Sequence, residues 1–176
     1  MKLLVSKYLF LFLCMSPISF PALAQRPHAD LAPGDDKKIA AQKADDEKKL
    51  QAFFTKNHIS PSKTPLGLYY TISKEGTGNK ILAGETVSLN YTGKLLDWTV
   101  FDSNTDPALH HTDPLIFEVG KGMVIKGYDK GVQLLKRGSV ATLYIPSGLA
   151  YGERTKPQIP ANSILIFDVE VLDVIR

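Results

Sequence analysis

The side chains best suited to form a binding or catalytic site are aromatic residues with one carboxylate among them. Phe101 is followed directly by Asp102, and Tyr151 follows the Ile145-Pro146 step. Such side chains can line an apolar site in which a few polar groups orient a ligand. Aromatic residues on alternating strands more often form the protein core, and Asp102 is also a typical turn residue. Residue types alone therefore leave both a site and a core open.

The sequence lacks the motifs of phosphate, metal and nucleophile chemistry. The glycine clusters at residues 76–78 and 120–122 match no phosphate-binding loop and are typical of turns. The adjacent His110 and His111 would face opposite ways on a strand, which favours loop residues over metal ligands. No Gly-x-Ser-x-Gly or His-Glu-x-x-His pattern occurs, and no spacing suggests a paired-carboxylate hydrolase. We therefore expect neither a metal nor a cofactor.

Residues 1–24 have the three parts of a secretory signal peptide. Lys2 and Lys7 give a basic start, an apolar run covers residues 8–15, and small residues precede a cleavage point after Ala24. A membrane anchor is the alternative, but the run is shorter than the ~20 residues that span a bilayer. We expect cleavage after Ala24 and export to the periplasm or the medium, with no membrane span in the mature chain.

Charge and cysteine content exclude further classes of protein. Cys14 is the only cysteine and lies inside the predicted signal, so the mature chain would have no disulfide and no thiol chemistry. The full chain carries a net charge of +3, and loss of Lys2 and Lys7 leaves about +1. This small charge gives no electrostatic basis for binding nucleic acid.

Residues 25–64 are predicted to form a linker and an N-terminal helical arm. Residues 35–57 begin with acidic side chains, continue with good helix formers and end at a typical terminator. Apolar side chains gather near the end of this helix, at Leu50, Phe53 and Phe54. Two interpretations remain open, a solvated helix with one apolar turn or a helix that docks or forms a homodimer through that turn.

Residues 65–176 are predicted to contain mostly strands and one short helix. The expected strands cover residues 68–73, 86–92, 115–119, 140–145 and 164–174, and the expected helix covers residues 127–135. In the last strand, apolar residues alternate with partly polar ones. Strands with one helix predict an α+β domain in which an antiparallel sheet is wrapped on that helix.

An ordered series of short motifs in this region resembles the FKBP family of peptidyl-prolyl cis–trans isomerases. The motifs are Tyr91-Thr92-Gly93, Phe101-Asp102-Ser103, Phe117-Glu118-Val119-Gly120, Val124-Ile125-Lys126-Gly127-Tyr128, Ile145-Pro146, Ala150-Tyr151-Gly152, Ile159-Pro160-Ala161-Asn162 and the stretch from Leu165 to Val171. Each motif alone is weak, but their shared order and spacing make the resemblance strong. It implies a five- to six-stranded curved antiparallel sheet wrapped around a short helix.

The resemblance also implies a pocket lined by aromatic side chains between sheet and helix. The positions that correspond to catalytic residues are Phe101, Asp102, Tyr151 and Phe167. The positions that correspond to substrate-binding residues are Tyr91, Leu115, Val124, Ile125, Tyr128 and Ile159. Tyr128 replaces the usual tryptophan of the pocket floor, and Leu115 replaces a usual aromatic residue. Both departures bear on the affinity for ligands and inhibitors.

The function that the resemblance implies is rotation of X–Pro peptide bonds in exported polypeptides that are folding, with macrolides as possible inhibitors. A chaperone or binding module that uses the same apolar pocket without catalysis is the alternative. The apolar end of the helical arm, at Phe53 and Phe54, leaves room for that alternative.

Overall fold

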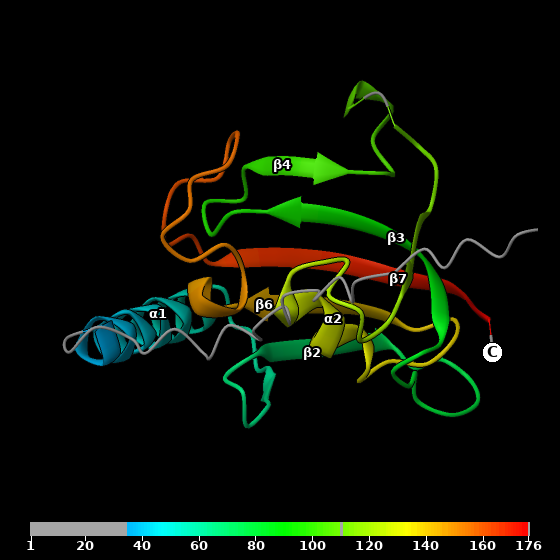
Figure 1. The fold of residues 1–176 in the computed structure, drawn as a ribbon, viewed down its shortest axis with the longest axis horizontal. Coiled ribbons are helices and arrows are strands. Elements are labelled where there is room, and N and C mark those ends of the chain that lie inside the picture. Colours follow the sequence, from blue (N-terminus) through cyan, green and yellow to red (C-terminus); the bar gives the residue numbers. More distant parts are fainter. Residues whose placement is uncertain (1–34, 110, 176) are drawn as a thin grey trace, which may run out of the picture. The chain divides into compact units, whose positions relative to one another are not determined.

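The computed structural model describes residues 35–109 and 111–175 (Figure 1). The predicted signal peptide and the first part of the linker, residues 1–34, lie outside the described residues, as do His110 and Arg176. Among the described residues, no helix has the length and apolar character needed to cross a membrane. The first described element is the predicted helix of the arm.

One antiparallel sheet of seven strands forms the centre of the fold. The elements are α1 (Asp35–Lys56), β1 (Ser62–Lys63), β2 (Tyr69–Lys74), β3 (Thr86–Lys94), β4 (Val100–Ser103), η1 (Pro107–Leu109), β5 (Leu115–Glu118), α2 (Lys126–Val132), β6 (Val140–Ile145), η2 (Ser147–Leu149) and β7 (Leu165–Ile175). The strand order is β1-β2-β6-β7-β3-β4. β5 pairs with the first part of β3 and β4 with its last part, so two short strands share one edge of β3.

The two faces of the sheet are covered by different helices. Successive side chains of a strand point to opposite faces of the sheet. Strand β7 therefore contributes side chains to the core on each face. Phe167 and Val169 join the core cluster that includes residues of α2, whereas Ile166 joins a second cluster that includes residues of α1. The strand is therefore apolar on both sides near its start, and its predicted alternation of apolar and polar residues holds only further along.

The short helix α2 approaches the sheet closely because two of its residues are glycine. A Cβ atom on Gly127 would lie 2.3 Å from Ile145 Cγ2, and one on Gly131 would lie 2.5 Å from Leu143 Cδ1. Both distances are shorter than any tolerated carbon–carbon contact. The glycines thus place the start of α2, and Tyr128 with it, directly against β6.

Helix α1 packs on the opposite face of the sheet, over what we call the arm cluster. This cluster consists of Leu50, Phe53, Phe54, Tyr69, Tyr144, Ile164 and Ile166. Leu50, Phe53 and Phe54 are only 0%, 8% and 4% exposed. The predicted apolar turn is therefore buried within the chain itself. This burial corrects both the interpretation as a solvated helix and the assignment of these three side chains to a dimer contact.

The predicted fold class is confirmed. The sheet is curved and antiparallel, a short helix packs on one of its faces, and an N-terminal helix precedes it. Six strands have four or more residues, and the two-residue β1 makes the seventh. The predicted helices and longer strands lie within a few residues of their expected positions, but residue patterns did not predict β1 and β4. The domain boundaries after residues 24 and 64 stay predictions.

Candidate functional site

Four aromatic side chains from four different elements meet on the α2 face of the sheet. This site cluster consists of Tyr91 of β3, Phe101 of β4, Tyr128 of α2 and Phe167 of β7. The ring centroid of Phe167 lies 5.0 Å from that of Tyr128, 5.6 Å from that of Phe101 and 6.2 Å from that of Tyr91. These are the distances of tilted and edge-to-face ring contacts. Phe167 is the centre of the cluster.

A glycine in β3 allows two of these rings to meet. Gly93 is paired with Asp102 on one neighbouring strand and with Phe167 on the other. A Cβ atom at Gly93 would lie 2.6 Å from the Phe101 ring and 3.0 Å from the Phe167 ring. Any larger residue would therefore separate Phe101 from Phe167, which explains the glycine in the Tyr91-Thr92-Gly93 motif.

The Asp102 carboxylate is held from two sides at the border of the site cluster. The Tyr91 hydroxyl donates a hydrogen bond to Oδ2 at 2.7 Å, and His111 Nε2 lies 2.8 Å from Oδ1. The Asp102 side chain is 42% exposed and the His111 side chain 45%. Burial of Tyr91 and its hydrogen bond to Asp102 raise the pKa of the Tyr91 hydroxyl, which stays protonated near neutral pH. Asp102 therefore orients Tyr91 and does not remove its proton.

His111 is a contact that sequence reasoning missed. Its placement in a loop was predicted correctly, but its pairing with Asp102 depends on the path of the chain between η1 and β5. The spacing of residues in the sequence does not predict the path of such a loop. Across residues 35–109 and 111–175, no three His, Cys, Asp or Glu side chains are grouped so that they could hold a metal ion.

Tyr128 forms the base of the site cluster. It is 2% exposed, and the rings of Tyr91 and Phe117 lie 6.5 Å and 6.0 Å from it. Its hydroxyl is buried and has no hydrogen-bond partner among the described residues. Burial, with a smaller contribution from Tyr91, raises the pKa of this hydroxyl. The base of the cluster is thus uncharged, although it carries one unpaired polar atom.

The remaining predicted side chains belong to the same apolar core as the site cluster or pack against it. Ile159 is buried in the same apolar core. Four others are partly buried and pack against that core: Leu115, Val124, Ile125 and Tyr151. Ile125 precedes α2, and its carbonyl accepts the N–H groups of Tyr128 and Asp129. Nine of the ten predicted residues therefore belong to, or pack against, one apolar core, and Asp102 is joined to it through Tyr91. Their individual roles in catalysis and substrate binding stay predictions.

Comparison with known proteins identifies the family of this arrangement. The model of the FKBP-type peptidyl-prolyl cis-trans isomerase family matches residues 78–172, which is more than half of the chain. The chain belongs to this family. The resemblance inferred from the motifs is thereby confirmed, and the matched residues contain every predicted site residue.

Relatives and solved structures agree with this family. The FKBP-type peptidyl-prolyl cis-trans isomerase FkpA of Aeromonas hydrophila is 45% identical over 111 residues, which cover 63% of this chain and 39% of that protein. A probable FKBP-type peptidyl-prolyl cis-trans isomerase of Haemophilus influenzae is 41% identical over 137 residues, or 77% of this chain and 54% of that protein. The chain thus spans less than two thirds of the length of either relative.

Two crystal structures resemble the fold of the chain. FkpA from Escherichia coli superposes with a TM-score of 0.64 at 34% identity, covering 80% of this chain and 64% of that one. AtFKBP13 superposes with a TM-score of 0.59 at 35% identity, covering 65% of this chain and 98% of that one. AtFKBP13 is thus matched over nearly its full length, which indicates that the family fold is present as a whole.

Proposed function

We propose that this FKBP-family chain is a peptidyl-prolyl cis–trans isomerase whose active site is the site cluster with Asp102, Ile125 and Tyr151 at its border. The observation that carries the proposal is the convergence of Tyr91, Phe101 and Tyr128 on Phe167. Four rings form an apolar surface, and the Asp102 carboxylate lies at its border, bonded to the Tyr91 hydroxyl. Such a surface suits an uncharged prolyl ring.

The chemistry of the reaction explains why apolar walls are sufficient. Rotation about a peptide bond faces a barrier of about 18–20 kcal/mol because resonance stiffens the C–N bond. Rotation removes the charge-separated resonance form, so the twisted amide is less polar than the planar one. An apolar site therefore favours the twisted state over the ground state, as catalysis by differential binding requires. No bond breaks and no proton moves, so no nucleophile, metal or cofactor is needed.

The polar groups at the border have orienting roles in this proposal. The backbone N–H of Ile125 and the hydroxyl of Tyr151 would donate hydrogen bonds to substrate carbonyls, as the family resemblance implies. Asp102 holds the Tyr91 hydroxyl and provides a local field. The raised pKa of Tyr91 supports a site that works without proton transfer near neutral pH.

The partners we propose are proline-containing polypeptides that are folding after export, with macrolides as possible inhibitors. The predicted signal peptide supports export, and intact-mass analysis of the exported chain would show Gln25 as its first residue. A product that still begins at Met1 would exclude cleavage. A homodimer through the arm stays a prediction and would have to use exposed side chains of α1 in place of the buried Leu50, Phe53 and Phe54.

A protease-coupled assay with a short X–Pro peptide tests the proposed activity. We expect the purified chain to accelerate cis-to-trans exchange, whose uncatalysed time is roughly 10–100 s. The alternative is a chaperone that holds unfolded chains on the same surface. A folded chain that suppresses aggregation of an unfolded protein but leaves the exchange rate unchanged would establish that alternative.

A further inference from the structure

The segment that carries Tyr151 lies between the two helices of the fold. η2 follows β6 directly and ends two residues before Tyr151. On the side of α2, a Cβ atom at Gly127 would lie 3.2 Å from both the Cβ and the carbonyl oxygen of Leu149. On the other side, η2 contacts α1 through Ser147 and Asp46. The position of Tyr151 thus depends on contacts made on both sides of η2.

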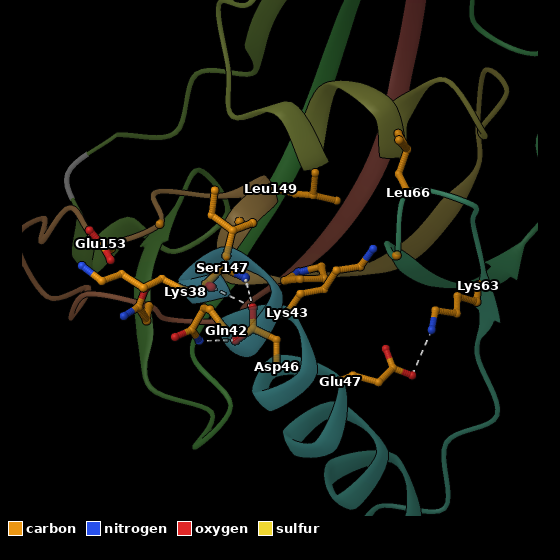
Figure 2. Close-up of a pocket in the computed structure, with 16 residues that line it drawn as sticks. Lys38, Gln42, Lys43, Asp46, Glu47, Lys63, Leu66, Ser147, Leu149 and Glu153 are labelled. Atoms are coloured by element: carbon orange, nitrogen blue, oxygen red, sulfur yellow. Dashed lines mark hydrogen bonds and ion pairs between the residues drawn. The ribbon is translucent and has the colours of Figure 1, made fainter. Parts of the chain in front are cut away.

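Asp46 of α1 is a buried carboxylate that reaches this segment (Figure 2). Its Oδ2 atom accepts hydrogen bonds from the Ser147 backbone N–H at 2.8 Å and from the Ser147 hydroxyl at 2.7 Å. Its Oδ1 atom accepts one from Gln42 Nε2 at 2.8 Å. Asp46 is 1% exposed and Ser147 0%. Two hydrogen bonds to one carboxylate oxygen therefore hold both the backbone and the side chain of Ser147.

Ser147 in turn holds both neighbours of Tyr151. Its carbonyl accepts the N–H of Ala150 at 3.0 Å and the N–H of Gly152 at 2.9 Å. The carbonyl of Gly152 accepts the N–H of Asn162 at 2.7 Å, which ties the segment to the loop that contains Ile159. A continuous series of hydrogen bonds therefore runs from Asp46 through Ser147 to the backbone on each side of Tyr151.

We propose that Asp46 is a positioning residue of the active site, which sets the place of the Tyr151 hydroxyl through Ser147. The inference rests on the proposed isomerase function and extends it to a helix that lies outside the matched family region. α1 would then do more than cover the outer face of the sheet. Movement of the middle of α1 would change the geometry of Tyr151 without any contact between α1 and the substrate.

A double-mutant cycle between Asp46 and Tyr151 tests this inference. We expect Asp46→Asn, which keeps the shape but removes the charge, to lower kcat/KM about threefold. Asp46→Ala should lower it further, but not beyond the loss caused by Tyr151→Phe alone. In the Tyr151→Phe background, Asp46→Asn should have no further effect, because the hydroxyl that it positions is already absent. Asp45→Ala, on the exposed side of the same turn, is the matched control and should retain the wild-type rate.

An equal loss from Asp46→Asn in both backgrounds would show a general structural role and would overturn the inference. So would wild-type kcat/KM in a folded Asp46→Asn variant. If Asp46→Ala does not fold, the Asn variant still decides the question.

Amide hydrogen exchange separates this inference from the proposed function. In Asp46→Asn, the amides of Ala150 and Gly152 should exchange faster than in the wild type, whereas the amide of Val169 in β7 should not change. If the wild-type chain proves inactive, the proposed function fails and the exchange rates still report on Asp46. Unchanged exchange at Ala150 and Gly152 would overturn the positioning role.

Discussion

The two aromatic clusters of this protein lie on opposite faces of one sheet and differ in how they are covered. The site cluster leaves Tyr91 and Phe101 partly exposed beside the Asp102 carboxylate. The arm cluster is sealed by α1, and its rings have exposures of 8% or less. Similar side chains on adjacent strands thus form an open surface on one face and a closed core on the other. The helix that covers a face, rather than the residue type, decides which of the two results.

The buried tyrosine hydroxyls of the two clusters also differ, in whether they have hydrogen-bond partners. The Tyr69 hydroxyl of the arm cluster donates to Glu47 and accepts a hydrogen bond from Gln51, both on α1. The Tyr128 hydroxyl of the site cluster has no partner among the described residues. The arm cluster is thus satisfied internally, as expected for a structural core, whereas the site cluster is left with an unmet hydrogen-bonding capacity.

The largest effects should come from removing one ring from each cluster. Phe167→Ala and Phe54→Ala should each lower the free energy of unfolding by about 3–5 kcal/mol, since both side chains are buried. Only Phe167→Ala should also abolish most of the isomerase activity, because it removes the ring on which the site cluster converges. Urea denaturation and the peptide assay measure the two quantities.

The leucine variants at the same positions keep the comparison informative if the alanine variants unfold. Phe101→Leu is a milder change of the site wall and serves as a further control. If folded Phe54 and Phe167 variants lost equal activity, the claim that only the site cluster contributes to catalysis would be wrong.

Tyr151→Phe should have a smaller effect, confined to activity. It deletes one hydrogen bond worth about 0.5–1.5 kcal/mol, which corresponds to a loss of roughly 2- to 13-fold if the bond forms only in the transition state. Because Tyr151 is partly exposed, we expect little change in stability. Separate measurement of kcat and KM shows whether the loss lies in kcat. A complete loss of activity in folded protein would point to acid–base chemistry instead.

Tyr128→Phe should stabilise the protein. The Tyr128 hydroxyl is buried and has no partner within residues 35–109 and 111–175, and an unsatisfied buried group costs about 1–3 kcal/mol. Its removal should raise the free energy of unfolding by about 1 kcal/mol, measured by urea denaturation. The matched change in the arm cluster, Tyr69→Phe, should lower stability because that hydroxyl is bonded. The comparison fails if the two variants shift stability in the same direction.

The smallest effect should be a pH dependence of stability at the arm. Partial burial raises the pKa of Glu47, but hydrogen bonds from Tyr69, Lys63 and Gln51 outweigh it and hold the pKa below the usual 4.5. A lowered pKa in the folded state adds stability above pH 4.5 that is lost as the pH falls through the folded-state value. The side chain is 39% exposed, so the effect should stay below about 1 kcal/mol.

Urea denaturation of the wild type and of Glu47→Gln checks this small effect. The variant should be less stable than the wild type at about pH 6, and the difference should shrink as the pH falls below 4.5. A constant difference across this range would mean that ionisation of Glu47 does not contribute.

Much of this arrangement was predictable from the sequence, because strand alternation and the motif order are local signals. The strand at residues 140–145 was predicted to the residue, and Phe167, one of the predicted site residues, lies at the centre of the site cluster. The function of α1 was not predictable. Its apolar turn indicated a contact, but the sequence does not show that the partner surface is formed by Tyr69 and Tyr144 of the same chain.

Contacts between distant segments were missed for a related reason. Asp46 and Ser147 are 101 residues apart, and Asp102 meets His111 through an irregular loop. Neither pair has a periodic pattern, and a charged residue in a polar helix resembles a solvated one. Only the folded chain shows that Asp46 is buried while the adjacent Asp45 is exposed.

The central claim is that an apolar surface, without proton transfer, catalyses rotation, and the pH dependence of kcat/KM tests it most directly. His111 is bonded to Asp102, and histidine is the side-chain type whose charge commonly changes between pH 5 and 8, so the decisive profile is that of His111→Gln. We predict that kcat/KM of His111→Gln changes by less than about twofold between about pH 6 and 8. Adding Asp102→Asn to this variant should lower kcat/KM by the same factor at each pH. A rate in folded His111→Gln that follows a single ionisation across this range would contradict the account.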